Sequence, residues 1–310
     1  MKVLIVGFGN MGARHLQSIL NEFKKVEAHV FELNRTVFLN NLKMIKVNEK
    51  KVIYHKDFNT IPKKIDFCVV ATPSEPRFDI VNKLLEFEID KFLLEKIVFQ
   101  SDFQFGNILD KIENSNKQIY CNFISRYYKN FVELKKSLKA KKITMIINGD
   151  DFGFACNTLH FIDLFEYFTD SKSRIINSEI SKDLRGNKRG VNYVELNGKL
   201  KSVTDKGDKF FIKNDLSKSN GMDLFIVTED NFHLFNYKNK THKLINFNGI
   251  KEFDFQIKYT SELTAEIYKD ILNNNCLLPT LKQTRSSHSQ FLGIVNDALN
   301  LKQTDQCPIT

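Results

Sequence analysis

Residues 2–12 read KVLIVGFGNMG, an apolar run that leads directly into the pattern G-x-G-x-x-G formed by Gly7, Gly9 and Gly12. In a strand–loop–helix unit the first glycine makes a tight turn, the second lets the backbone approach a pyrophosphate, and the third lets helix and strand pack closely. A helical pattern follows over residues 11–23, and the N-terminus of such a helix offers N–H groups to an anion. The stretch predicts a dinucleotide-binding loop whose contacts are Gly7, Gly9, Asn10, Met11 and Gly12.

The acidic residue that completes this motif is expected about 20 positions further on, at the end of the second strand. Glu32 closes the apolar run 28–32 (AHVFE). Its carboxylate would accept hydrogen bonds from the adenosine ribose and repel a 2′-phosphate, which favours NAD(H). Arg35 follows close behind and would suit such a phosphate, so NADP(H) stays open. The plain alternative is a glycine turn without a ligand and an exposed Glu32, but strand, spacing and acid together favour the cofactor.

Up to about residue 122, short apolar runs alternate with helical patterns. The predicted strands are 2–6, 28–32, 51–54, 66–71, 91–94 and 118–123, and the predicted helices are 11–23, 35–45, 76–87 and 101–114. Strands that alternate with helices form right-handed parallel βαβ units. We therefore expect residues 1–122 to form an α/β Rossmann domain with a parallel sheet.

The pattern changes after residue 122. Helical patterns cover 127–140 and 158–168, a strand covers 143–148, and two helices, 260–273 and 283–301, close the chain. Between 175 and 247 lie short alternating runs such as 191–196, 209–212, 224–227 and 232–237, broken by turns at Lys-Gly-Asp and Glu-Asp-Asn. Asn197-Gly198 between two runs predicts a hairpin. Residues 123–310 should thus form an α+β domain with a mostly antiparallel sheet.

This second domain is expected to bind substrate and to oligomerise, with its C-terminal helix packing back on the Rossmann domain. An antiparallel sheet that has helices on one face leaves the other face to be covered. A second copy of the same chain would cover it in a two-fold dimer. The meander therefore predicts a homodimer or a homotetramer.

The composition excludes several other classes of protein. The 310 residues are 42% hydrophobic and carry a net charge of +9, mostly from lysines scattered along the chain without an arginine-rich block. Scattered lysines form a solvated surface rather than a nucleic-acid patch, although they attract anionic ligands such as dinucleotides. No apolar run approaches a membrane span, and the strand at the first residues leaves no room for a signal peptide.

The five cysteines also bear on the compartment. Cys68, Cys121, Cys156, Cys276 and Cys307 are odd in number, and no two are spaced as metal ligands. We expect no metal site and a reducing, cytoplasmic compartment.

Five further motifs occur in a characteristic order. They are Gly12-Ala13-Arg14-His15, Ala71-Thr72-Pro73-Ser74, Glu95-Lys96, Asn122-Phe123 with Arg126-Tyr127, and His160-Phe161-Ile162-Asp163. In this order and spacing the chain resembles the Gfo/Idh/MocA (glucose–fructose oxidoreductase / inositol dehydrogenase) family, densely over 1–130, patchily around 155–170 and only in architecture beyond. The resemblance implies a Rossmann domain, a C-terminal domain with a large antiparallel sheet, and NAD(P)-dependent interconversion of a sugar or cyclitol hydroxyl and its ketone.

The resemblance also assigns roles to residues. Lys96 matches the lysine of the family's Glu-Lys-Pro motif, and His160 and Asp163 match its histidine and aspartate, so these three are the implied catalytic residues. Thr72 and Pro73 match strand-end residues beside the nicotinamide half of the cofactor, and Glu95 and Lys96 are also expected there.

A lysine at a strand's carboxyl end can donate a proton to a forming alkoxide or, with a lowered pKa, accept one. Glu95 should face away from Lys96, as a packing or orienting partner. His160 and Asp163 lie three apart on one helical face, so His160 could assist the relay while Asp163 orients it. The alternative for Lys96 is an ordinary surface lysine. The alternatives for His160 and Asp163 are a hydrogen-bonded histidine at a helix start and a charge at a helix end.

Three residues depart from the family pattern around the chemistry. Ile97 replaces the proline of Glu-Lys-Pro, Arg77 replaces a histidine, and Cys156 replaces an aspartate. If Lys96 is not the proton donor, Arg77 or the Asp150–Asp151 pair would take its place.

The leading hypothesis is an NAD-dependent oxidoreductase that interconverts a hydroxyl and a ketone on a sugar, amino sugar or nucleotide-sugar. A C=C or C=N reductase of the same fold is one alternative. A catalytically degenerate NAD(H)-binding sensor or assembly protein is another, and the three departures motivate it.

Overall fold

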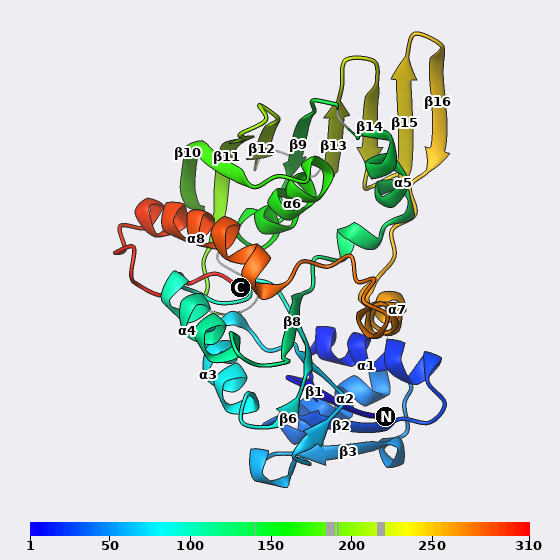
Figure 1. Ribbon diagram of the computed structural model, residues 1–310, viewed down its shortest axis with the longest axis vertical. Coiled ribbons are helices and arrows are strands. Elements are labelled where there is room, and N and C mark those ends of the chain that lie inside the picture. Colours follow the sequence, from blue (N-terminus) through cyan, green and yellow to red (C-terminus); the bar gives the residue numbers. More distant parts are fainter. Residues whose placement is uncertain (140, 184–189, 191, 216–220) are drawn as a thin grey trace. The chain divides into compact units, whose positions relative to one another are not determined.

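The computed structural model describes residues 1–139, 141–183, 190, 192–215 and 221–310 (Figure 1). Ala140 and Val191, each the end residue of a predicted element, lie outside this set. The chain divides into a first compact unit of residues 1–99, 103–124 and 258–283 and a second of residues 100–102, 125–257 and 284–310. Residues 258–283, which the sequence prediction placed in the second domain, thus belong to the first unit.

The first unit is built on a six-stranded sheet whose strand order is β3-β2-β1-β5-β7-β8. The strands are β1 (Lys2–Val6), β2 (Glu27–Phe31), β3 (Val52–His55), β5 (Phe67–Val70), β7 (Lys91–Leu94) and β8 (Gln118–Cys121). Every neighbouring pair is parallel, and Val6 is in register with Phe31 and Val70. The carboxyl ends of the central strands therefore lie at one edge. This confirms the predicted parallel Rossmann sheet.

Helices follow the strands in the order that the alternation predicts. They are α1 (Asn10–Glu22), α2 (Arg35–Met44), α3 (Ser74–Leu84) and α4 (Asp102–Ile112), with the short turns η1 (Glu49–Lys51) and η2 (Phe58–Thr60) and a two-stranded pair β4 (Lys64–Ile65) and β6 (Glu88–Ile89). Helix α7 (Thr260–Leu272) returns from late in the chain and packs against α1. The backbone N–H of Ala265 donates to Ser18 Oγ at 3.0 Å, because these small residues let the helices approach closely.

The second unit contains an eight-stranded sheet of order β10-β11-β12-β9-β13-β14-β15-β16. Its strands are β9 (Thr144–Asp150), β10 (Ser173–Asp183), β11 (Glu195–Thr204), β12 (Lys209–Asp215), β13 (Met222–Val227), β14 (Phe232–Asn236), β15 (Thr241–Asn246) and β16 (Gly249–Asp254). All pairs are antiparallel except β9 with β12. The prediction of a mostly antiparallel sheet after the Rossmann domain is therefore confirmed.

Helices of the second unit pack on one face of this sheet. They are α5 (Lys129–Ser137), α6 (Phe154–Thr169) and α8 (Leu281–Ala298), preceded by the short η3 (Ile124–Tyr127). Phe131 of α5 contacts Phe235 with ring centres 5.0 Å apart, and Phe165 of α6 stacks on Phe210 at 5.5 Å. None of the helices in the described part of the chain is long and apolar enough to cross a membrane.

The predicted hairpin at Asn197-Gly198 is wrong, because both residues lie inside β11. Gly198 has a φ of +143°, and a Cβ at this position would lie 2.0 Å from the carbonyl oxygen of Glu179 in β10. The glycine therefore serves a close approach between two strand backbones rather than a turn. The predicted turn at 206–208, by contrast, does join β11 to β12, with Gly207 at a φ of +85°.

Candidate functional site

The glycine loop joins β1 to α1 at the edge where the parallel strands end. Gly7 has a φ of +84°, and a Cβ there would lie 2.8 Å from the backbone nitrogen of Thr72. A Cβ at Gly12 would lie 2.0 Å from the carbonyl oxygen of Gly7, whereas a Cβ at Gly9 would meet no heavy atom within 4 Å. Packing therefore demands glycine at the first and third positions, and open space lies over the second. This is the cradle that a pyrophosphate needs.

Helix α1 presents its N-terminus to the same space. Within the described chain, no side chain caps α1 and no acidic residue occupies its first turn. Met11 in that turn is 39% exposed. The first N–H groups of a helix have no acceptor within the helix and can bind an anion, so the roles of Asn10 and Met11 in cofactor binding stay a prediction.

Glu32 follows β2 and is fixed beside the loop. Its Oε2 accepts a hydrogen bond from the N–H of Phe8 at 2.9 Å, and its Oε1 accepts one from the N–H of Asn34 at 2.9 Å. Each carboxylate oxygen has further acceptor capacity for a ribose hydroxyl. The residues present therefore fit a dinucleotide with its pyrophosphate at the loop and its ribose at Glu32.

Arg35, the first residue of α2, makes contacts that the sequence did not reveal. Its guanidinium carbon lies 4.4 Å from the ring centre of Tyr54 and 4.8 Å from that of Phe38. The same guanidinium forms an ion pair with Glu49 in η1. No spacing rule links positions 35 and 49, because the pair forms only when β3 folds beside β2.

Thr72 and Pro73 follow β5 beside the loop, and α3 begins at the next residue. Arg77 in α3 is 1% exposed and donates hydrogen bonds to the backbone carbonyls of Glu95, Ile97 and Thr72. The residue that replaces the family's histidine therefore holds the segment after β7 against the segment after β5. The peptide bond between Lys96 and Ile97 in that segment is cis.

Glu95 belongs to a buried hydrogen-bond network. Its Oε1 accepts from Asn122 Nδ2 at 2.7 Å and lies 3.0 Å from His15 Nε2, while His15 Nδ1 lies 2.8 Å from Thr264 Oγ1 in α7. Burial opposes ionisation of Glu95, but the hydrogen bonds from His15 and Asn122 and the nearby charge of Lys96 outweigh it and lower its pKa to about 2. His15 is part of a motif identified in the sequence, but its contact with Glu95 was not predicted.

Lys96 lies in the first unit, directly after Glu95, whereas His160 and Asp163 lie on α6 in the second unit. Asp163 is 6% exposed and accepts two hydrogen bonds from Arg126, from Nε at 2.8 Å and from Nη2 at 2.7 Å. Burial raises the pKa of Asp163 and the Arg126 charge opposes that rise. From the sequence we expected Asp163 to orient His160, and Arg126 was not predicted as the ionic partner of Asp163.

The remaining residues of the predicted chemistry are placed as follows. Cys156 lies in the first turn of α6, where its Sγ donates to the Thr310 carbonyl at 3.0 Å. Asp150 ends β9 and Asp151 follows it with a φ of +51°. Among the described residues, no group of three or more histidine, cysteine or acidic side chains is arranged to hold a metal.

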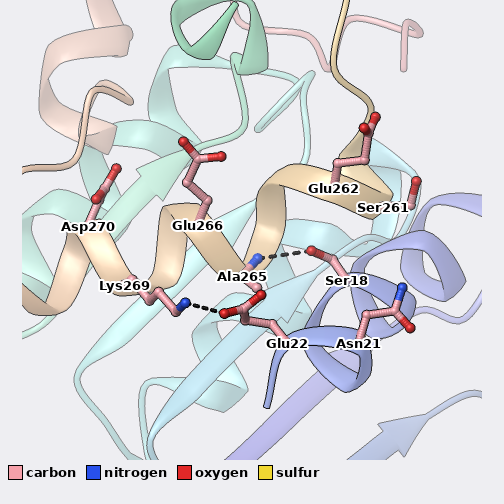
Figure 2. A pocket seen from close by; sticks show the side chains of 9 residues that line it. All are labelled: Ser18, Asn21, Glu22, Ser261, Glu262, Ala265, Glu266, Lys269 and Asp270. Atoms are coloured by element: carbon pink, nitrogen blue, oxygen red, sulfur yellow. Dashed lines mark hydrogen bonds and ion pairs between the residues drawn. The ribbon is translucent and has the colours of Figure 1, made fainter.

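A groove between α1 and α7 carries several acidic side chains (Figure 2), and three of them have partners within the unit. Glu22 pairs with Lys269, and Glu266 pairs with Lys258 at 2.8 Å. Glu262 accepts from the N–H of Tyr259 at 2.8 Å and so caps α7. These interactions explain the groove as a packing feature of two helices.

Comparison with known proteins extends this description. A family model, GFO_IDH_MocA, described as an oxidoreductase family with an NAD-binding Rossmann fold, matches residues 1–123. No curated protein sequence matches the chain.

Solved structures of the same fold cover nearly the whole chain. UDP-N-acetylglucosamine 3-dehydrogenase GnnA from Acidithiobacillus ferrooxidans has a TM-score of 0.76 at 12% identity, over 96% of this chain and 99% of that chain. An oxidoreductase from Agrobacterium radiobacter in complex with NAD+, L-tartaric acid and magnesium has a TM-score of 0.75 at 10% identity, over 97% and 96%. The transcriptional regulator Gal80p from Kluyveromyces lactis has a TM-score of 0.73 at 14% identity, over 96% and 89%. At these identities the likeness shows the fold alone.

Proposed function

Because residues 1–123 belong to the NAD-binding Rossmann fold of the Gfo/Idh/MocA oxidoreductase family, we propose that the protein is an NAD-dependent oxidoreductase. Its reaction is the interconversion of a hydroxyl and a ketone on a sugar, amino sugar or nucleotide-sugar. The observation that carries the proposal is the glycine loop, where Gly7 and Gly12 are required by packing and Gly9 leaves room for a pyrophosphate.

The bound cofactor would supply or take up a hydride at C4 of its nicotinamide ring. Residues Gly7–Gly12 would hold the pyrophosphate and Glu32 the ribose, while Thr72 and Pro73 would serve the nicotinamide half. Lys96 donates a proton to the substrate oxygen during reduction and accepts it during oxidation. Glu95 lies beside Lys96, whose charge helps to lower the pKa of Glu95 to about 2, and a positive charge on Lys96 would stabilise an oxyanion in the reduction direction.

The proposed catalytic set includes two residues of the second unit. His160 assists the proton transfer, and Asp163, which is held by Arg126, maintains the geometry of this part of α6. A charged pair in which both carboxylate oxygens accept from one guanidinium has a fixed orientation. Asp163 would therefore act as a positioning residue.

The substrate class rests on three considerations. The fold is that of a UDP-N-acetylglucosamine 3-dehydrogenase over nearly all of the chain, the family is one of oxidoreductases, and the net charge of +9 attracts anionic ligands such as nucleotide-sugars. The protein would act in the cytoplasm, because an odd number of cysteines, none spaced as metal ligands, is typical of a reducing compartment.

The test is a turnover assay on a panel of nucleotide-sugars, amino sugars and free sugars, with NAD+ or NADH followed by absorbance. We expect one sugar class to give turnover that Lys96→Met abolishes. A panel that includes small C=C and C=N substrates distinguishes the alternative reductase activity. Turnover on those substrates alone would overturn the sugar assignment.

A second candidate from another class is an NAD(H)-binding sensor or assembly protein without catalysis. Arg77 favours it, because the residue at the family's histidine position is committed to backbone carbonyls. A transcriptional regulator also shares the fold. Stoichiometric NADH binding with no turnover on the whole panel would support this candidate over the first.

A further inference from the structure

Three charged residues surround the place where the adenosine ribose is expected. Glu32 is held by the N–H groups of Phe8 and Asn34, at the end of β2. Arg35 lies one turn further and is ion-paired with Glu49. The side chains of Arg35 and Glu49 are 44% and 48% exposed, so both can meet a ligand from solution.

Local structure fixes the positions of Arg35 and Glu49. Asn34 caps α2, since its Oδ1 accepts from the N–H of Thr36 at 2.9 Å, and Asn48 caps η1 in the same way through the N–H of Lys50 at 2.9 Å. Arg35 and Glu49 are the first residues of these two elements. Helix caps of this kind define where a helix starts. The two caps therefore fix the backbone positions from which Arg35 and Glu49 form their ion pair.

The aromatic rings beneath Arg35 keep its guanidinium in this place. Tyr54 of β3 and Phe38 of α2 contact each other with ring centres 4.7 Å apart, and the guanidinium lies over both rings. A cation over an aromatic face is attracted by it. The two rings would therefore keep the Arg35 guanidinium in place even without Glu49, and its positive charge could then pair with an anionic ligand.

The charges of the three residues decide which ribose the site accepts. Glu32, Arg35 and Glu49 contribute −1, +1 and −1, a sum of −1. A phosphate monoester brings a further charge of about −1.5 to −2 at neutral pH. We infer that Glu49 is a specificity-determining residue that acts through Arg35: it neutralises the one cation able to receive a 2′-phosphate and so makes the site selective for NAD(H). The inference rests on the proposed NAD-dependent function.

The experiment measures dissociation constants of NADH and NADPH by nucleotide fluorescence for four proteins: wild type, Glu49→Gln, the double variant Glu49→Gln/Arg35→Met, and Glu113→Gln. Glu113 is an exposed acid on the same unit, far from the ribose position in sequence, and serves as the matched loss of one negative charge. Glu49→Gln should bind NADPH more tightly by up to about fivefold, the upper end for an exposed ion pair, with NADH affinity unchanged.

The other variants distinguish an effect that acts through Arg35 from the general effect of losing one negative charge. Arg35→Met in the Glu49→Gln background should abolish the gain, Glu113→Gln should leave both affinities unchanged, and the gain should shrink at high salt because exposed charges are screened. If wild type binds NADH but Glu49→Gln leaves NADPH affinity unchanged, or if the gain survives Arg35→Met, the inference is overturned while the proposed function stands. If wild type binds neither nucleotide, both are overturned.

Discussion

The guanidinium of Arg77 holds the backbone carbonyls of Thr72, Glu95 and Ile97 together inside the first unit. These carbonyls belong to the segments that carry Pro73 and Lys96, two of the predicted site residues. A charged donor that serves several buried carbonyls stabilises more than a neutral one, and its loss leaves those acceptors unsatisfied. Arg77 therefore has a structural role in holding these two segments together.

Arg77→Met tests this role. The variant keeps the apolar stem and removes every donor, so we expect the free energy of unfolding to fall by about 2–4 kcal/mol, the range for a charged hydrogen-bonding group removed from a buried site. Urea denaturation measures the change, with the exposed Arg174 in β10, changed to Met, as the control that should be near wild type. An Arg77→Met variant as stable as wild type would show that the carbonyls do not depend on Arg77.

Lys96→Met tests the proposed chemistry. The change removes the charge but keeps the stem, so NADH affinity should stay within a few-fold while turnover falls by about two to four powers of ten, the usual value of one positioned acid–base group. His160→Ala should lower turnover less and alter its pH profile, and the two effects should not add, because both residues act on one proton. Near-normal turnover of Lys96→Met would remove Lys96 from the mechanism and shift attention to Asp150–Asp151, since Arg77 is buried and committed to backbone carbonyls.

The arrangement of the glycine loop and Glu32 could be predicted from the sequence because its determinants are local. Gly7, Gly9, Gly12 and Glu32 lie within one βαβ unit, where spacing alone fixes their relation. The partners of Arg77, Glu95 and Asp163 could not be predicted, since they are backbone carbonyls or side chains that tertiary packing brings near. For example, Glu95 and His15 are 80 positions apart in the chain.

The strands and helices also differ in whether local sequence or tertiary packing determines them. The strands at 2–6 and 91–94 are found as predicted, because a buried parallel strand reads as a continuous apolar run. The prediction of a hairpin at Asn197-Gly198 was wrong, because the sequence alone does not distinguish a glycine required for the close approach of two strands from a glycine in a turn. The local sequence pattern predicts where an element lies, but the backbone that packs against a glycine is determined by the tertiary structure.

Strands β14 and β15 carry two histidines that make the second unit sensitive to acid. His233 Nδ1 lies 3.1 Å from His242 Nε2, and burial, with the charges of Lys141 and His233 respectively, lowers the pKa of each to about 4. Their ordinary pKa is 6.5, so the unfolded chain takes up protons that the folded unit does not. The stability they contribute is complete above pH 6.5 and is lost as the pH falls towards 4, at up to about 1.4 kcal/mol per pH unit per histidine.

Urea midpoints at pH 6.5 and pH 5.0 measure this loss, in a range above the pKa of ordinary carboxylates. In the double variant His233→Leu/His242→Phe, the new phenyl ring can take the place of the imidazole between Phe235 and Phe253. We expect its midpoint to fall less between the two pH values than that of wild type. Equal falls in both proteins would exclude the two histidines as the cause.

The sheet of the second unit has one face that helices α5 and α6 cover and one face with partly exposed apolar side chains. Leu224 and Phe235 point to the covered face and are fully buried, whereas their strand neighbours Phe225 and Leu234 point to the other face and are half-buried. An apolar sheet face of this kind is typical of a surface that a second copy buries. We therefore keep the prediction of a homodimer or homotetramer.

Light scattering coupled to gel filtration tests the assembly at micromolar concentration. Wild type should elute as a dimer or tetramer, and Leu234→Lys, which places a charge on that face, should shift the population towards monomer. The control is Lys243→Gln on the same face, next to Leu234 in the register, which removes a charge and should preserve assembly. A stable wild-type monomer would rule the prediction out.

Titration of NADH and NADPH into the purified wild-type protein, followed by fluorescence, tests most directly the central claim that the glycine loop and Glu32 bind NAD(H) in preference to NADP(H). NADH should bind more tightly than NADPH, and Glu32→Ala should narrow the gap. Gly9→Val should weaken both by at least about tenfold, or about 1.4 kcal/mol, without loss of fold, because Gly9 has a φ of −69° and open space at its Cβ. NADPH binding tenfold tighter than NADH, or NADH affinity untouched by Gly9→Val, would contradict the account.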